Sequence, residues 1–191
     1  MGGDRVKWGS IKFDGLDALI QRLEEAQANV PALLCACADS LAANLHAQVT
    51  ELTPVGKRPM WAFLRAEEDD IVSVGDGVSK RERLEEHWKG YVGGELKKSW
   101  KIRRAASNGN TANAFVYNNT QYARYVEYGH RQTPGRYVPA IGLQLKESWA
   151  GGSHMLETAR KRTDAAFATI TESEVNKFMS AALKGGYTPD E

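Results

Sequence analysis

The first regular pattern along the chain is a stripe of apolar residues spaced three and four positions apart. This spacing puts the side chains on one face of an α-helix. Asp14 stands where it can cap the start of the helix, and the pattern ends near Asn29. The stripe consists of Leu16, Leu19, Ile20 and Leu23. We therefore expect an amphipathic helix over residues 14–29.

A second helix follows directly. Pro31 suits its first turn, where the N–H that proline lacks has no partner in any case, and Thr53-Pro54 ends the pattern. The apolar stripe is Leu34, Ala38, Leu41, Leu45, Val49 and Leu52. Cys35 and Cys37, two positions apart in this helix, point to different faces. We expect small buried residues here rather than a disulfide or a metal pair.

The middle of the chain changes to a pattern of strands. One helical turn over residues 95–99 leads to an expected strand over 100–106 and a returning strand over 112–117. Between the strands, Asn108-Gly109 favours the positive backbone angles of a tight turn. The pattern predicts a β-hairpin.

Helical patterns return after the hairpin. Thr120 can cap a short helix, which Gly129 would end through left-handed backbone geometry. Residues 137–140 look like a brief strand, in which Pro139 argues for an edge or an end. Apolar residues at helical spacing then predict a long helix from about residue 152 to residue 185.

Together these elements predict an α+β fold with an N-terminal helix pair, a small antiparallel β-sheet with an embedded short helix, and a long C-terminal helix. The length of 191 residues fits a single domain over residues 1–191. Residues 56–93 depart from this plan, and we interpret them as an inserted loop or subdomain. Within them, residues 80–88 predict a short helix.

Composition excludes several broad classes of protein. Hydrophobic residues make up 42% and charged residues 26%, as in ordinary globular proteins. Lys and Arg total 25 against 24 Asp and Glu, so any contact with nucleic acid must be local. The polar, glycine-rich start lacks the apolar core of a signal peptide, and no uninterrupted apolar run of about 18 residues is present. We expect synthesis in the cytoplasm and no membrane contact.

The sequence contains no pattern typical of a catalytic or cofactor-binding site. The four histidines, His46, His87, His130 and His154, lack the four-residue helical step of zinc hydrolases. The glycines match neither a P-loop nor a dinucleotide-binding turn, and the serines lack a nucleophile elbow. We expect no enzyme activity, no metal site and no cofactor.

Glu127 is the one carboxylate that stands out. It lies between apolar and aromatic neighbours, so partial burial would require a hydrogen-bonding or cationic partner. The candidate partners are Arg124, Arg131 and Arg136. We interpret Glu127 as one half of a structural ion pair that holds the loop after Gly129, in preference to a catalytic group.

A basic cluster surrounds Trp100 and Ile102. Its members are Lys97, Lys98, Lys101, Arg103 and Arg104. Such a cluster is typical of a solvated strand edge, where charge prevents strand-to-strand aggregation. The alternative is contact with passing DNA or with an acidic neighbouring protein, because phosphate contact needs only clustered charge.

Several segments, taken in order, resemble a known phage family, the one named for gene product ten of phage HK-ninety-seven. Residues 118–130 resemble its Asn, Tyr-Ala, Val-Glu and Gly-Thr/His phrase. Thr53-Pro54-Val55 is similar to the end of its helix, and residues 94–100 to its Thr-Gly-x-Leu-x-x-Ser-aromatic segment. Residues 135–140 and 149–156 look like its closing loop and the start of its C-terminal helix. The family normally has only a few residues in place of segment 56–93.

The resemblance singles out a set of positions as motif or interface candidates. They are Thr53, Pro54, Leu96, Ser99, Trp100, Tyr122, Ala123, Tyr125, Val126, Glu127, Gly129, Arg136 and Pro139. Trp61 and Phe63 are interface candidates within the insertion, and the basic cluster is the candidate DNA-facing surface.

The resemblance implies a virion structural protein of the head–tail neck or tail top, called a tail component or tail-completion protein. Such proteins form rings, with six copies expected here, stacked between head-closure or connector proteins and the tail tube. A collar subunit that caps a contractile sheath and tube is the nearest alternative, a DNA-contacting morphogenesis protein is the strongest rival, and an enzyme is a distant third. The tail could be contractile, non-contractile or part of a headless particle made in a bacterial cytoplasm.

Overall fold

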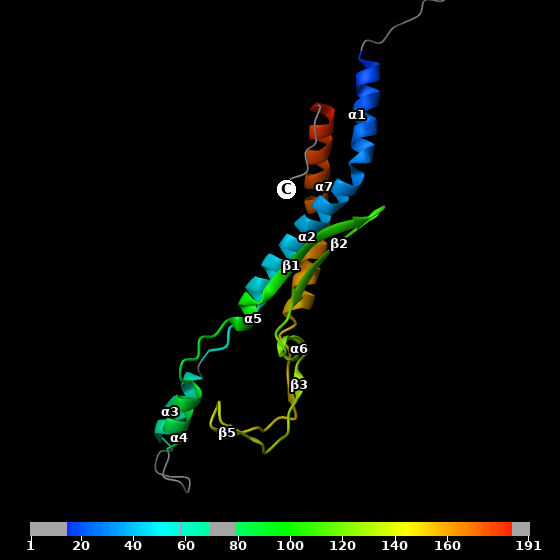
Figure 1. The fold of residues 1–191 in the computed structure, drawn as a ribbon. Helices are drawn as coiled ribbons and strands as arrows, with labels where there is room; N and C mark the ends of the chain where they lie inside the picture. The colour runs from blue at the N-terminus through cyan, green and yellow to red at the C-terminus, as the bar shows by residue number, and fades with distance from the viewer. Residues whose placement is uncertain (1–14, 58, 69–78, 185–191) are drawn as a thin grey trace, which may run out of the picture. The chain divides into compact units, whose positions relative to one another are not determined.

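The computed structural model describes residues 15–57, 59–68 and 79–184, except for the side chains of Trp61, Glu67 and Glu68. Figure 1 shows the elements in chain order. The helices are α1 (Leu16–Ala28), α2 (Val30–Leu52), α3 (Met60–Glu68), α4 (Lys80–His87), α5 (Glu95–Lys98), α6 (Ala123–Tyr128) and α7 (Met155–Lys184). The strands are β1 (Trp100–Asn108), β2 (Thr111–Asn118), β3 (His130–Arg131), β4 (Tyr137–Val138), β5 (Leu143–Gln144) and β6 (Trp149–Ala150). The predicted α+β fold is confirmed.

In the described part of the chain, the strands form three separate pairs. The hairpin β1–β2 is the predicted one, with Gly109 at a positive φ of 64° in its turn. In the second pair, β3 runs antiparallel to β6 with His130 opposite Ala150. In the third, β4 runs antiparallel to β5 with Val138 opposite Leu143. The short helix α6 therefore follows the hairpin and leads into these two small ladders.

The chain divides into two compact units. The first comprises Met1–Leu41, Arg104–Ala114 and Phe167–Glu191, and the second comprises Ala42–Arg103 and Phe115–Ala166. Each unit draws on segments that are far apart in the sequence, so neither could be recognised as one continuous stretch of chain.

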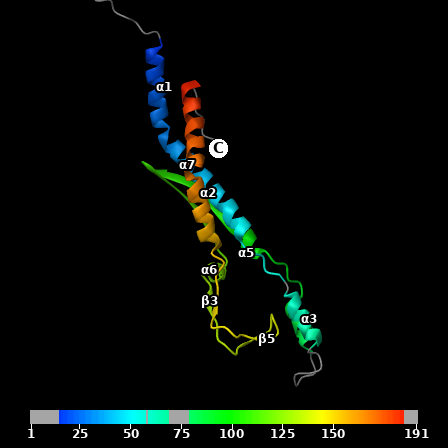
Figure 2. The same cartoon turned by 180° about the vertical axis from the view of Figure 1, so that it is seen from behind.

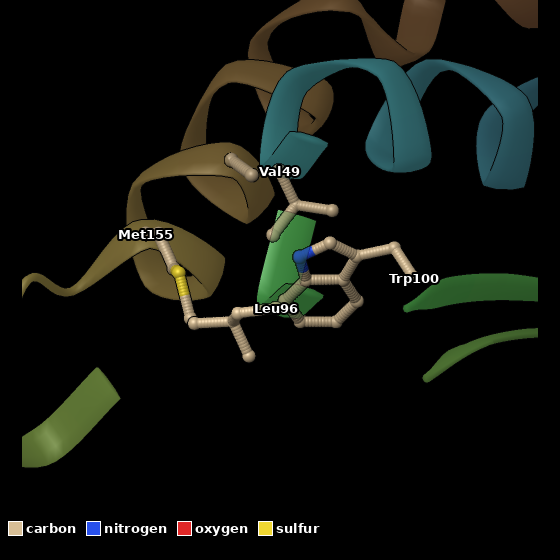
Figure 3. Close-up of a cluster of buried hydrophobic side chains, with 5 residues drawn as sticks. Val49, Leu96, Trp100 and Met155 are labelled. Atoms are coloured by element: carbon tan, nitrogen blue, oxygen red, sulfur yellow. The ribbon is translucent and has the colours of Figure 1, made fainter. Parts of the chain in front are cut away.

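The second unit contains a hydrophobic cluster around Trp100. Val49 from α2, Leu96 from α5 and Met155 from α7 surround the indole ring, as Figure 3 shows. Trp100 is 8% exposed, and Val49 is fully buried. The indole Nε1–H donates a hydrogen bond to Thr53 Oγ1 over 2.8 Å, so the polar edge of the ring is satisfied inside the cluster.

In the described part of segment 56–93, two helices pack together as a helical hairpin. Figures 1 and 2 show α3 and α4 side by side, and a small core of Ala62, Ala66 and Leu84 joins them. Ser79 and Glu82 form a capping box at the start of α4, which explains why a predominantly charged segment becomes helical. The predicted helix over 80–88 is confirmed as α4.

The helical hairpin also contacts the turn between β4 and β5. The Nε1–H of Trp88 donates to the carbonyl oxygen of Ala140 over 2.8 Å. Gly142 lies against Leu84, and it has a positive φ of 64° that favours glycine. Where the segment leaves and rejoins the chain, a Cβ on Gly93 would lie 2.2 Å from the carbonyl oxygen of Gly56. The two connecting backbones are therefore in direct contact.

In the first unit, α1 lies beside the end of α7 in both views (Figures 1 and 2), and Arg22 Nη1 donates to the carbonyl oxygen of Leu183 over 3.0 Å. None of the residues of α1 is buried. The amphipathic helix predicted over 14–29 is confirmed, although its apolar face is only partly covered. Asp14 lies outside the described residues, and the N-cap is Gly15, with no side-chain hydrogen bond.

Helix α2 is the one described helix that is long and apolar enough to cross a membrane by length and composition. The sequence reading, which looked for an uninterrupted apolar run, did not detect it. A helix in a protein core meets the same criteria, and the polar side chains of α2 have protein partners. Asp39 accepts the N–H of Ala105 over 2.6 Å, and Asn44 accepts the hydroxyl of Thr163 over 3.0 Å. These contacts show that α2 packs against β1 and α7, although most of its residues are only partly buried.

Candidate functional site

Glu127 connects α6 to the start of the long helix α7. Its side chain is 5% exposed, and its two carboxylate oxygens accept the backbone N–H groups of Leu156 and Glu157 over 2.9 Å and 3.1 Å. The first N–H groups of a helix have no partner within the helix, and their positive end attracts an anion. Glu127 therefore supplies from a distant segment the N-terminal cap that α7 lacks locally.

The burial and structural role predicted for Glu127 are confirmed, but the predicted partner is wrong. Backbone N–H groups, and not Arg124, Arg131 or Arg136, satisfy the carboxylate among the described residues. The N-terminus of a helix presents several aligned N–H donors, so it can bind a carboxylate in place of an arginine guanidinium. The residue before α7 is His154, which is not a favoured N-cap residue, and this absence of a local cap was the available sequence signal.

Two glycines let the backbones at this junction approach each other. Gly129 has a φ of 80°, and a Cβ there would lie 2.3 Å from the carbonyl oxygen of Ala150. A Cβ on Gly152 would lie 2.2 Å from the carbonyl oxygen of Glu127. Gly129 ends α6 with a positive φ as expected, but its ψ of 177° differs from the predicted left-handed helical conformation. Thr120, however, does not cap α6, because its hydroxyl donates to Asn118 Oδ1 over 2.8 Å.

Most of the other motif residues stabilise the fold around the Trp100 cluster. Leu96 is buried in it, and Ala123 and Val126 pack against it. Ser99 donates to the carbonyl oxygen of Glu95 over 2.7 Å and so closes the single turn of α5. The motif residues thus lie where α2, the hairpin and α7 pack together.

A few motif residues are exposed and line an open cleft of about 980 Å³. Tyr125 is 45% exposed, with the Arg124 guanidinium 5.0 Å from its ring centre and the His130 ring edge-on at 5.8 Å. The Tyr122 hydroxyl donates to Glu95 over 3.1 Å. Burial, followed by this hydrogen bond and the charge of Glu95, raises the pKa of Tyr122. The side chains that line this cleft include Pro54, Tyr122, Tyr125, Val126, His130 and Arg131.

The remaining interface candidates are spread over the second unit. Phe63 is partly buried against the core of the helical hairpin, and Trp61 lies in α3 with its side chain outside the described residues. Arg136 and Pro139 are exposed on either side of the β4 strand. The structure therefore does not gather the sequence-selected residues into a single site.

Most residues of the basic cluster are exposed. Lys98, Lys101, Arg103 and Arg104 are exposed, and Lys97 is partly exposed. The Arg103 guanidinium lies 4.1 Å from the ring centre of Phe115, which is 48% exposed, and Tyr117 is 39% exposed. The exposure of these two aromatic rings was not predicted from the sequence. It could have been inferred from the alternation of β2, in which Ala112, Ala114 and Val116 are the more buried positions and the residues between them are exposed.

Among the residues that the structure describes, no group of three or more His, Cys, Asp or Glu side chains could hold a metal ion. Cys35 and Cys37 are free thiols and only partly buried. Burial, with a smaller contribution from the charge of Glu174, raises the pKa of Cys37, which keeps the thiol protonated near neutral pH.

The chain combines a buried scaffold of motif residues with exposed aromatic and basic side chains. A family model described as "Bacteriophage HK97-gp10, putative tail-component" matches residues 17–129, which is more than half of the 191 residues. The chain belongs to this family of phage tail components and is a structural protein of the virion tail. No curated protein and no solved structure matches the chain.

Replacing Glu127 by alanine should lower the free energy of unfolding by about 1–3 kcal/mol, because two N–H groups at the start of α7 lose their partners. Glu127→Gln keeps one acceptor oxygen and should cost less. Urea denaturation followed by circular dichroism measures both changes. Glu147→Ala, at an exposed position, is the control and should stay within about 0.5 kcal/mol of the unmodified protein. An equal loss in Glu127→Ala and Glu147→Ala would contradict the capping role.

Proposed function

We propose that this tail component forms a ring, with six copies, at the head–tail neck or tail top. There it completes the tail and joins the tail tube to the connector. Its partners are further copies of itself, the tail tube protein and the neighbouring head-closure proteins. The proposal applies the role of the family to the surfaces described above.

The observation that carries the proposal is the apolar surface left exposed on helices that belong to a folded chain. The four apolar residues of the α1 stripe are between 41% and 51% exposed, and α1 buries no residue. On α7, Phe167 is 53% exposed and Leu183 is 50% exposed. A 13-residue helix is marginal in water without a partner, and contiguous apolar patches of this kind mark interaction sites.

A ring needs two different complementary patches on each subunit, because head-to-tail contacts close on themselves only when the two differ. The cleft lined by Tyr125 is one candidate patch, since aromatic and arginine side chains are enriched at the centres of interfaces. Trp61 and Phe63 in the helical hairpin remain candidates for a contact with a neighbouring tail protein.

The purified protein should appear as rings by negative-stain electron microscopy and as a matching oligomer by light scattering. Tyr125→Ala should lower the affinity of assembly or of co-sedimentation with tail tubes by about tenfold or more, as expected for an aromatic interface residue. Tyr137→Ala is the matched control, because Tyr137 is 44% exposed but does not line the cleft. A persistent monomer that leaves tail tubes unoccupied would refute the ring.

The exposed basic and aromatic residues of β1 and β2 favour one second function, which is contact with DNA passing through the neck. Binding to duplex DNA should then weaken steeply as salt rises, because each phosphate contact releases a counterion. Fluorescence anisotropy at several salt concentrations measures this slope. Retention on DNA that does not depend on salt would count against a phosphate contact.

A further inference from the structure

We propose that α1 of one copy docks on the outer face of the β1–β2 hairpin of the next copy in the ring. This inference rests on the ring proposed above and adds a pair of complementary patches to the cleft lined by Tyr125. The first patch, called here the α1 face, consists of Asp17, Glu24 and the stripe Leu16, Leu19, Ile20 and Leu23. The second, called the hairpin face, consists of Lys101, Arg103, Phe115 and Tyr117.

The α1 face is apolar along its middle and acidic along one border. At 3.6 residues per turn, Asp17 and Glu24 are seven positions apart and lie on the same side of the helix, next to Ile20. Arg22 falls on the opposite border, where its guanidinium binds the carbonyl oxygen of Leu183. The free border of the stripe is therefore negatively charged.

The hairpin face has the complementary properties. Phe115 and Tyr117 are 48% and 39% exposed and offer an apolar surface, and Lys101 and Arg103 are exposed cations on β1. The Arg103 guanidinium stacks 4.1 Å from the centre of the Phe115 ring, which holds the charge beside the apolar surface. A helix with an apolar stripe and an acidic border fits a strand pair with aromatic rings and a basic row.

The pairing also has the symmetry that a ring requires. The two faces differ in sequence, charge and secondary structure, so the contact is head-to-tail and each subunit keeps one free face of each kind for its two neighbours. Complementary charge fixes which faces meet and suppresses the contact of two like faces. A second copy of this chain is therefore the occupant that both faces select.

Charge reversal tests the pairing. Asp17→Lys with Glu24→Lys, or Lys101→Glu with Arg103→Glu, should each raise the concentration needed for ring formation by about tenfold or more, because like charges then face each other. An equimolar mixture of the two double variants should recover rings to within about threefold of the unmodified protein. If the two variants alternate around the ring, each reversed α1 face meets a reversed hairpin face and each unmodified α1 face meets an unmodified hairpin face, so no like charges face each other.

Mass spectrometry of the mixed rings should find equal numbers of the two variants. Glu25→Lys and Lys146→Glu are controls, since both residues are exposed and neither belongs to the two faces. Circular dichroism of each variant checks that it has folded.

Rings that tolerate both reversals would refute the docking while leaving the ring intact, and an unmodified protein that stays monomeric would refute both. Folded variants that fail to assemble even when mixed would also refute the docking. Loss of DNA binding in Lys101→Glu with Arg103→Glu, with ring formation unchanged, would assign the hairpin face to nucleic acid instead.

Discussion

Replacing Trp100 by alanine is expected to lower the free energy of unfolding by about 3–5 kcal/mol, the range for a large aromatic side chain removed from a core. The ring lies in the centre of the cluster formed by Val49, Leu96 and Met155, and it is 8% exposed. Alanine would leave a cavity and would also remove the partner of Thr53 Oγ1. Urea denaturation measures the change, with unfolding followed by far-ultraviolet circular dichroism of the backbone so that the signal does not depend on the removed tryptophan.

Trp100→Phe separates packing from the hydrogen bond. Phenylalanine retains most of the apolar contact but cannot donate to Thr53 Oγ1, so it should cost about 1–2 kcal/mol. Ring formation by the folded fraction should be unaffected in both variants. A loss below about 1 kcal/mol in Trp100→Ala would show that the cluster does not stabilise the fold as described.

Replacing Gly152 by alanine is the second large effect and should destabilise the protein by at least about 2 kcal/mol. The new Cβ would lie 2.2 Å from the carbonyl oxygen of Glu127 and 2.6 Å from the carbonyl carbon of Tyr128. Both atoms belong to the backbone, so they cannot move aside as a flexible side chain would. The shift would separate Glu127 from the start of α7 and weaken its cap.

Gly151 provides a matched control for this prediction. A Cβ at Gly151 meets no atom within 4 Å, so Gly151→Ala should leave the midpoint of thermal unfolding nearly unchanged. Comparison of the two midpoints, together with the protection of α7 amides against hydrogen exchange, distinguishes a local clash from a general loss of loop flexibility. Equal midpoints for the two variants would show that the junction has room for a side chain.

The helices and the main hairpin were predictable because their signals are local. The apolar spacing of α1 and α2, the Asn108-Gly109 turn and the long apolar period of α7 each lie within one stretch of chain. The brief strand predicted over 137–140 is present as β4. The strands β3, β5 and β6 have two residues each, too few to show an alternating pattern, and only their pairing with another part of the chain makes them strands.

The candidate site was predictable in part. The sequence indicated that Glu127 would need a partner, but the donors that satisfy it are about 30 positions away, in backbone that carries no sequence signal of its own. The contact of Trp88 with Ala140 likewise joins residues 52 positions apart. The apolar stripe of α1 predicted a helix but could not show that the stripe stays exposed, because exposure depends on what the rest of the chain covers.

The contact between Gly56 and Gly93 has a consequence for how this chain could gain or lose its helical hairpin. Because the outgoing and returning backbones already touch, excision of the residues between the two glycines would leave ends that a very short bridge can join. A graft of a different segment at the same place would likewise impose little strain on the Trp100 cluster. The cost of excision would fall on the β4–β5 turn, where Ala140 and Gly142 would be left facing water.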